Sequence, residues 1–393
     1  MKSLPIKILT ALITFSLGVA IASLWLSKWM SPAIEPIALH SPPPGRLEMV
    51  FVLDTTGSMG GLIEGAKQRI WGIVNEVMQE SHSSVKVGLV AYRDRGDQYV
   101  TQVLPLTEDL DEVYMKLMNY EAAGGGDTRE DVRSALSAGL NRTGWSPAAS
   151  DLSQIIFLVG DAPPHDDYEE STDTLLTARF AVEKGIIVNT IQCGPAEETK
   201  RAWQAIAKHG NGQYFAIEQS GGVQAITTPF DEELGRLANR LGSTFVVYGF
   251  GADPEGATKR EARASLASSV EVAVQARAPA PAKAERALNK AISSKAYVGD
   301  LLQSIENGSV QIESINPSDL PADLQTLSAD ERRREIEKRL AERREIRAQI
   351  VSLSRQRQAF IDAEKKKRNA GKDGFDEVVS KSLMEQLRRK KIK

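Results

Sequence analysis

Apolar runs alternate with helical patterns between residues 49 and 207. Residues 49–53, 85–92, 155–159 and 186–191 are short apolar runs typical of strands, and they alternate with helical patterns at 62–78, 110–120, 175–182 and 202–207. Strands that alternate with helices predict βαβ units around a mostly parallel sheet. We therefore expect an α/β, doubly wound, Rossmann-like domain whose sheet is flanked by helices, spanning residues 46–243.

Two of these predicted strands, 50–53 and 155–159, are apolar on both faces, as expected of central strands that helices cover on each side. An aspartate closely follows each of them, Asp54 after the first and Asp161 after the second. In open α/β sheets the ligand crevice lies outside the carboxyl ends of the strands. The two aspartates are therefore predicted to face the same crevice.

After residue 243 the alternation of strand and helix patterns ends, and helical patterns predominate. Residues 244–248 predict a last strand, and two Ala-rich helical patterns follow at 257–276 and 284–305, separated by the Ala-Pro-Ala-Pro sequence at 278–281. These patterns define a helical region, 244–327. Residues 328–393 form a charged, basic tail that begins with one long helix, 328–368. Its apolar positions have coiled-coil-like spacing that an arginine interrupts: Ile346, Ile350, Leu353, Arg357 and Phe360. This helix is predicted to pack or to self-associate.

The N-terminal residues 1–30 predict export. Lys2 and Lys7 precede an uncharged, mainly apolar run at 8–26, which is long enough to span a bilayer. The small residues at 20–22 resemble a cleavage site, so both a cleaved signal peptide and a membrane anchor remain open. A Pro-rich linker, 31–45, follows. We expect a cell-envelope protein that is anchored through residues 8–26 and faces the periplasm or the exterior, or that is secreted if the signal is cleaved.

The charge distribution indicates which kinds of partner the chain could bind, and the cysteine count excludes an intramolecular disulfide. The net charge is -3, but residues 331–393 carry 21 Lys and Arg against 11 Asp and Glu, so the tail is basic and the body acidic. Solvent exposure at the end of a helix is enough to account for the basic charge of this tail. An exported protein also has little access to nucleic acid. The single Cys193 cannot form an intramolecular disulfide. No nucleic-acid partner is predicted.

The turn after the first strand carries the candidate chemistry. Asp54, Thr56 and Ser58 place a carboxylate and two hydroxyls at alternate positions, where they can converge on one point. Hard oxygen ligands suit Mg²⁺, Mn²⁺ or Ca²⁺ better than zinc or copper. The alternative is a helix N-terminus capped by hydroxyl groups, which needs no metal.

Two further loops can complete such a site: Gly-Gly-Gly-Asp-Thr-Arg-Glu at 124–130 and Gly-Asp at 160–161. With these loops, residues 46–241 resemble a von Willebrand factor A domain with a metal-ion-dependent adhesion site, as in bacterial exported or membrane-anchored proteins. The resemblance implies a Mg²⁺ site on Asp54, Thr56, Ser58, Thr128 and Asp161. It also implies a protein partner whose acidic side chain completes the metal sphere, and no enzymatic activity. Asp127 or Glu130 remain alternatives to Thr128.

A second class of function is enzymatic. The sequence Asp-Thr-Thr-Gly-Ser also resembles the phosphorylated aspartate motif of haloacid-dehalogenase-like phosphotransferases, in which Asp54 would be the nucleophile. In that class the residue after the nucleophile is a lysine, and here it is Thr55. His165 stands where a second aspartate of the magnesium loop is expected. A Mg²⁺-dependent phosphatase is therefore the alternative, and a purely structural envelope scaffold is a third reading.

Overall fold

The computed structural model describes residues 45–81, 84–126, 128–165, 167–168, 170–222, 226–250, 254–367 and 374–391. The predicted export segment, 1–30, and all of the Pro-rich linker except residue 45 lie outside these residues, so both stay predictions. Within the described part of the chain, no helix is both long and apolar enough to cross a membrane.

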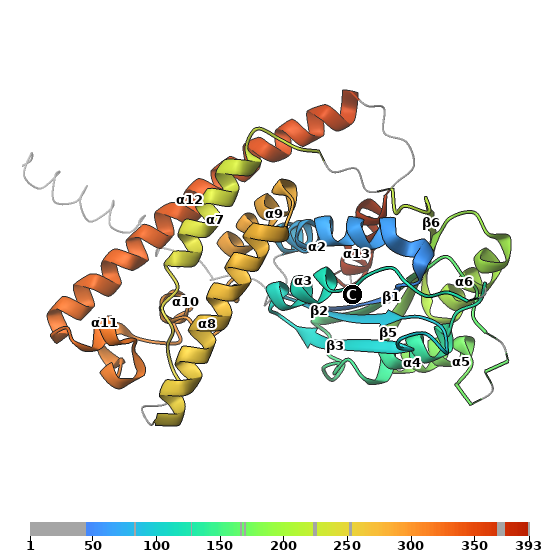
Figure 1. Ribbon diagram of the computed structural model, residues 1–393, viewed down its shortest axis with the longest axis horizontal. Helices are drawn as coiled ribbons and strands as arrows, with labels where there is room; N and C mark the ends of the chain where they lie inside the picture. The colour runs from blue at the N-terminus through green and yellow to red at the C-terminus, as the bar shows by residue number, and fades with distance from the viewer. Residues whose placement is uncertain are drawn as a thin grey trace, which may run out of the picture. The chain divides into compact units, whose positions relative to one another are not determined.

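The centre of the fold is a six-stranded sheet with the strand order β3-β2-β1-β4-β5-β6 (Figure 1). Every neighbouring pair is parallel except β2 and β3, which are antiparallel. This confirms the predicted mostly parallel α/β sheet. The strands are β1 (Arg46–Asp54), β2 (Ser84–Tyr92), β3 (Thr101–Thr107), β4 (Leu152–Gly160), β5 (Ile186–Cys193) and β6 (Asn211–Ile217).

The two edge strands, β3 and β6, were not predicted. Most of their residues are only half-buried, and polar side chains interrupt both strands. Edge strands lack the long apolar runs that mark β1 and β4, whose residues are almost all buried. The predicted last strand at 244–248 does not belong to the sheet, because only Val247 forms a bridge, with Asp300 outside the sheet. That prediction was wrong.

Alternate residues of β1 divide the core into two layers. Met49 and Phe51 pack on the face covered by α2 (Gly60–Ser81) and α3 (Leu110–Met118). Val50 and Val52 pack on the opposite face, which is covered by α4 (Val132–Asn141), α5 (Thr174–Glu183) and α6 (Glu197–His209). Side chains alternate across a strand, so an apolar strand serves both layers at once.

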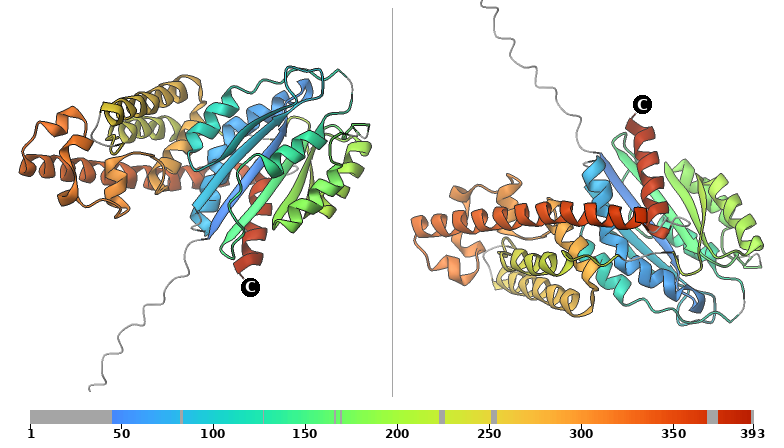
Figure 2. Two further views of the ribbon diagram at one scale, coloured as in Figure 1. Left: turned by 90° about the horizontal axis from the view of Figure 1, so that it is seen from below. Right: turned by 90° about the horizontal axis from the view of Figure 1, so that it is seen from above.

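The last helix, α13 (Phe375–Lys391), belongs to the first of these layers and not to a separate tail. The Phe375 ring lies 6.0 Å from the Phe51 ring. Asn189 of β5 donates to the Ser382 hydroxyl at 3.2 Å. Figure 2 shows α13 against the sheet. Residues 328–393 therefore do not act as one tail, because their last part completes the core of the sheet domain.

The helical region between the sheet and the long helix contains α7 (Asp231–Ser243), α8 (Pro254–Arg277), α9 (Ala280–Ile292), α10 (Leu301–Glu306) and α11 (Ala322–Gln325). The second Ala-rich helix ends earlier than predicted, at Ile292. A new helix then starts after Asp300, whose side chain caps the backbone N–H groups of Leu302 and Gln303. This cap explains the break within the predicted helix 284–305.

The predicted long helix is confirmed as α12 (Ala329–Lys367). Ile346 and Ile350 are buried against α7 and α9, and Phe360 meets the Phe230 ring edge-on. The coiled-coil-like positions are therefore occupied by contacts within the same chain. Arg357, which interrupts the apolar spacing, donates to the Asp231 carboxylate at 2.7 Å and to Glu285 at 2.6 Å.

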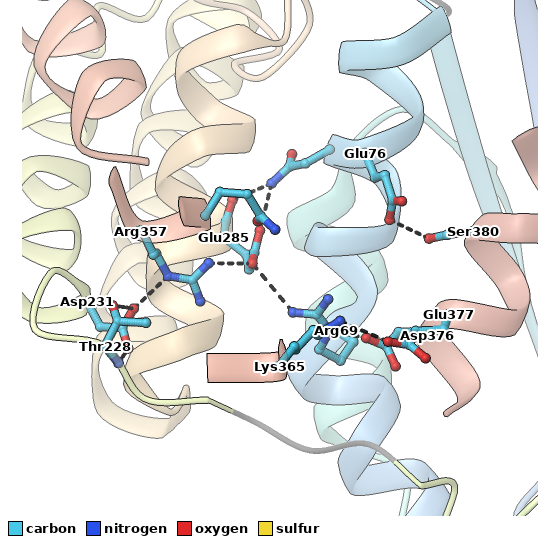
Figure 3. A network of polar contacts seen from close by, with 12 residues as sticks. Arg69, Glu76, Thr228, Asp231, Glu285, Arg357, Lys365, Asp376, Glu377 and Ser380 are labelled. Atoms are coloured by element: carbon cyan, nitrogen blue, oxygen red, sulfur yellow. Dashed lines mark hydrogen bonds and ion pairs between the residues drawn. The ribbon is translucent and has the colours of Figure 1, made fainter. Parts of the chain in front are cut away.

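A polar network joins α12 and α13 to the sheet domain (Figure 3). Glu285 of α9 accepts from Arg357 and lies 3.5 Å from the Arg69 guanidinium of α2. Arg69 in turn donates to Asp376 of α13 at 2.8 Å. These contacts connect α2, α9, α12 and α13, which lie far apart in the sequence.

Candidate metal centre

The predicted metal residues lie at the carboxyl edge of the sheet. Asp54 is the last residue of β1, and Asp161 directly follows β4, the strand that pairs with β1 in parallel. Thr56 and Ser58 lie in the turn that leads through a short 3-10 helix (Gly57–Met59) into α2. The structure therefore brings the first and third predicted loops to one crevice, as parallel strand ends require.

Asp54 is fully buried, and only one of its two carboxylate oxygens accepts close hydrogen bonds. Its Oδ1 accepts hydrogen bonds from the Thr56 backbone N–H at 2.8 Å and from the Thr56 hydroxyl at 2.6 Å. Its Oδ2 is buried and has no hydrogen-bond partner within 3.5 Å, and the more distant Asp161 backbone N–H acts only to lower the pKa of Asp54. Burial raises the pKa of Asp54 to about 7 against the opposing effect of these hydrogen bonds, and the charge of Asp161 adds to the rise. A buried carboxylate oxygen without a partner is costly unless a cation compensates it.

The hydroxyl groups of the turn do not cap a helix. Thr56 occupies the N-cap position of the 3-10 helix but makes no capping hydrogen bond with its side chain. Instead its hydroxyl faces Asp54 and lies 3.5 Å from the exposed Ser58 hydroxyl. The helix-cap alternative therefore does not describe these side chains, whereas a cluster of one carboxylate and two hydroxyls does.

Asp161 is held by a residue that the sequence did not single out. The Gln219 amide donates to Asp161 Oδ2 at 2.5 Å, and Gln219 lies just after β6. The Asp161 backbone carbonyl accepts from the Thr199 hydroxyl at 2.9 Å. No sequence motif marks Gln219, because only the order of β4, β5 and β6 in the sheet brings it to this edge.

In the second loop Glu130 is buried and Thr128 is exposed, and the role of Thr128 as a ligand stays a prediction. Thr128 is exposed, and Asp127 lies outside the described residues. Glu130 is only 3% exposed, and its Oε2 has no hydrogen-bond partner. Burial, followed by the charges of Asp54 and Asp94, raises the pKa of Glu130 to about 9.

The Gly-rich part of this loop lies directly against the turn after β1. The Gly57 N–H donates to the Gly124 carbonyl at 3.3 Å, and the Ala123 N–H donates to the Thr55 carbonyl at 3.1 Å. Gly124 and Gly125 have φ angles of 84° and 89°, which favour glycine. The Asp97 carboxylate accepts from the Gly125 N–H at 3.3 Å. Asp97 is a second contributor that the sequence analysis missed.

Neighbouring charged residues support the loops. Arg93 donates to the backbone carbonyls of Thr55 and Glu121 at 3.1 and 2.7 Å. Asp94 accepts from the Tyr168 hydroxyl at 2.9 Å, and the His165 ring stacks on the Tyr168 ring at 4.2 Å. These contacts tie the loop after β4 to the end of β2 and so fix the positions of the two loops.

The donor set fits a hard divalent cation through its oxygens. Within the described residues, no three or more Asp, Glu, His or Cys side chains form a cluster that could hold a metal ion by themselves. A cation here would therefore depend on the hydroxyls of Thr56 and Ser58 as well as on Asp54. Oxygen-only ligands of this kind suit Mg²⁺, Mn²⁺ and Ca²⁺.

Gly160 has no room for a side chain beside Asp54. A Cβ on Gly160 would stand 2.5 Å from the Tyr92 hydroxyl oxygen and 3.1 Å from Asp54 Oδ2. Gly160→Ala should therefore lower the free energy of unfolding by about 1–3 kcal/mol through overpacking. Urea denaturation followed by circular dichroism measures this change. Gly126→Ala is the control, because a Cβ there meets nothing within 4 Å. Equal stability of the two variants would contradict the described packing around Asp54.

A family model of the von Willebrand factor A domain matches residues 48–229. This stretch of the chain is therefore similar to a von Willebrand factor A (VWA) domain. The matched residues include the turn after β1, the Gly-rich loop and the loop after β4. They exclude α7 to α13, so the match does not include the helix that completes the core.

Curated relatives match the chain over only part of their own length. Von Willebrand factor A domain-containing protein 7 of Rattus norvegicus is 39% identical over 194 residues, which are 49% of this chain and 20% of the relative. The Homo sapiens protein of the same name is 37% identical over 118 residues, 30% of this chain and 12% of the relative. The chain therefore matches about a fifth or less of the length of these relatives. They are eukaryotic, so the bacterial, exported type stays a prediction.

Solved structures show weaker likeness. The SpRpn10 VWA domain has a TM-score of 0.34 at 14% identity, covering 44% of this chain and 88% of that one. A second structure is that of proximal thread matrix protein 1 from the mussel byssus with a zinc occupied MIDAS motif. Its TM-score is 0.34 at 12% identity, and the match covers 45% of this chain and 42% of that chain. VWA domains are generally non-enzymatic interaction modules, and none of these relatives supports the phosphotransferase alternative.

Proposed function

We propose that the VWA domain is a divalent-cation-dependent protein-binding module for adhesion or assembly. One observation carries the proposal: Asp54 Oδ2 is fully buried, without a hydrogen-bond partner, next to the hydroxyl of Thr56 at the open edge of the sheet. Burying an uncompensated carboxylate opposes folding, so its retention here needs a reason. A bound cation supplies that reason.

The residues of the site have distinct tasks in this proposal. Asp54, Thr56 and Ser58 hold the cation, Asp161 supports it from β4, and Thr128 is the ligand that the family resemblance implies in the second loop. Mg²⁺ is the expected ion, with Mn²⁺ or Ca²⁺ as alternatives. When bound, the ion offers an open coordination position to an oxygen of a protein partner. The family resemblance implies that this oxygen belongs to an acidic side chain of the partner.

The proposed location follows from the N-terminal sequence alone. Residues 8–26 would anchor the chain in a membrane and place the VWA domain in the cell envelope. A protease-protection assay on intact cells tests this location. If the VWA domain is digested only after the cytoplasmic membrane has been permeabilised, the domain lies in the cytoplasm and the proposed location is contradicted.

Asp54→Asn tests the cation site. It keeps the shape of the side chain but removes its charge, so saturable binding of Mg²⁺ and Mn²⁺ by the 393-residue chain should disappear in calorimetric titrations. In cation-free buffer the same variant should be more stable than the wild type by about 1 kcal/mol or more, because the buried charge is gone.

Asp362→Asn is the matched control, since Asp362 is an exposed residue of α12 outside the site. It should bind cations as the wild type does. Cation binding that survives in Asp54→Asn, or a folded wild-type chain that binds no cation, would overturn the proposed function.

A further inference from the structure

Two arginines of α12, Arg343 and Arg347, carry buried donor groups that have no acceptor. Arg343 Nη1, Arg347 Nε and Arg347 Nη2 are buried, and none of these nitrogens has a hydrogen-bond partner among the described residues. The Tyr297 hydroxyl is a further buried group without a partner, and the centre of its ring lies 5.4 Å from Arg343 Cζ. Burying donors without acceptors is costly, so this cluster calls for a group that accepts hydrogen bonds.

Other contacts of the two arginines fix their orientation. They are four residues apart, so they lie on the same side of α12. Arg343 is fully buried and donates to the hydroxyl and the carbonyl of Thr244 at 2.8 Å and to Asp300 at 2.6 Å. Arg347 donates through Nη1 to Glu306 at 2.6 Å. Glu306 ends α10, which contacts α12 (Figure 1). The unpartnered nitrogens therefore belong to side chains that the fold holds in place.

The unpartnered nitrogens of Arg347 form the edge of the guanidinium that suits anions best. On this Nε–Nη2 edge two N–H groups lie side by side and point in nearly the same direction. The same edge binds a carboxylate elsewhere in the chain. Arg286 donates from it to both oxygens of Asp111 at 2.7 and 2.8 Å, and Arg46 does so to Asp151 at 2.7 and 3.0 Å. Arg347 has this edge buried, with no carboxylate against it.

The charges of the cluster leave room for a monovalent anion. Three arginines of α12, Arg343, Arg344 and Arg347, lie within 4.0 Å of only two carboxylates, Asp300 and Glu306. Burial lowers the pKa of Arg347 more strongly than the Glu306 carboxylate raises it, and the charge of Arg343 lowers it further. An anion beside the Nε–Nη2 edge would offset both effects.

We propose that Arg347, together with Arg343 and Tyr297, binds a small monovalent anion of the chloride type between α12 and α10. Arginine nitrogens only donate hydrogen bonds. An anion can accept from all of them, whereas a water molecule has protons of its own to place. The bound anion would hold α10 against the long helix. The site lies in the helical region, so this inference does not depend on a cation at Asp54.

Equilibrium dialysis of the full 393-residue chain against radiolabelled chloride measures the bound anion directly. Sodium gluconate, whose anion is too large for the protein interior, keeps the ionic strength constant. The wild type should bind chloride saturably at a single class of sites, and bromide should compete. Chloride should also raise the melting temperature of the wild type, because it binds only the folded chain.

Arg347→Met should abolish this binding and the rise in melting temperature, because it removes the Nε–Nη2 edge. Arg344→Met is the matched control. It removes the same charge from the adjacent position, where the side chain is 68% exposed, and it should bind chloride as the wild type does.

Each outcome decides the matter. A folded wild-type chain that binds no chloride overturns the inference, and so does a Arg347→Met variant that binds it as the wild type does. Equal loss in Arg344→Met and Arg347→Met also overturns it, because binding would then follow net charge alone. If Arg347→Met does not fold, Arg347→Lys takes its place. It keeps the charge but lacks the Nε–Nη2 edge, so chloride binding should weaken several-fold, and unchanged binding overturns the inference.

Discussion

Phe375→Ala should lower the free energy of unfolding by about 3–5 kcal/mol, the range typical of a truncated core aromatic. Phe375 is 1% exposed and packs against Phe51, whose ring stacks on Phe157 at 5.4 Å. Its backbone N–H also donates to the Gly221 carbonyl at 2.9 Å. The variant would leave a cavity against the two central strands of the sheet.

Urea denaturation of the whole chain, followed by circular dichroism, measures this effect. Phe180→Ala is the control, because Phe180 on α5 is 41% exposed and should lose well under about 1 kcal/mol. A Phe375→Ala variant as stable as this control would show that α13 is not part of the domain core. The same contact means that deleting residues 328–393 removes part of the core of the sheet domain, so such a deletion cannot isolate the role of the long helix.

Arg286→Ala should lower the free energy of unfolding by about 3–5 kcal/mol, because the buried Asp111 carboxylate keeps its ion pair with Lys290 but loses both hydrogen bonds from the guanidinium. Arg286 of α9 is 1% exposed and donates to both oxygens of Asp111 on α3, at 2.7 and 2.8 Å. It also donates to both oxygens of Glu271 on α8, at 2.8 and 2.6 Å. This guanidinium therefore joins the helical region to the sheet domain.

Chemical denaturation again provides the measurement, with Arg236→Ala as the control. Arg236 is an exposed arginine paired with Glu233 one helical turn away, and such pairs contribute about 0–1 kcal/mol. Similar losses in the two variants would contradict the assigned role of Arg286.

The Arg286 cluster also predicts a pH dependence of stability. Burial by itself would raise the pKa of Asp111, but the charges and hydrogen bonds of Arg286 and Lys290 outweigh it and hold that pKa well below its usual range. A carboxylate with a depressed folded-state pKa adds stability above its unfolded pKa of about 4, and this stability is lost as the pH falls below that value. Stability measured from pH 6 to pH 2 should therefore fall less steeply in Arg286→Ala than in the wild type.

The candidate site shows which residues a motif can predict. Asp54, Thr56 and Ser58 were found because they lie within five consecutive residues of one turn, and Asp161 was found because it directly follows an apolar strand. In the second loop the Gly-rich sequence was recognised, but Thr128, Asp127 and Glu130 could not be separated. That choice depends on the path of the loop between α3 and α4, which the backbone contacts of Glu130 with Pro163 and His165 determine.

The sequence by itself determined the class of the fold, the long helix and the first and third loops of the site, because each depends on local periodicity or on adjacent residues. Only the tertiary structure decided that Glu130 is buried, that Gln219 supports Asp161, and that α13 completes the core next to Phe51. These contacts join residues 58 to 324 positions apart in the chain, as Gln219 with Asp161 and Phe375 with Phe51 illustrate. No local pattern encodes such pairings, because they arise from the burial of whole faces against one another.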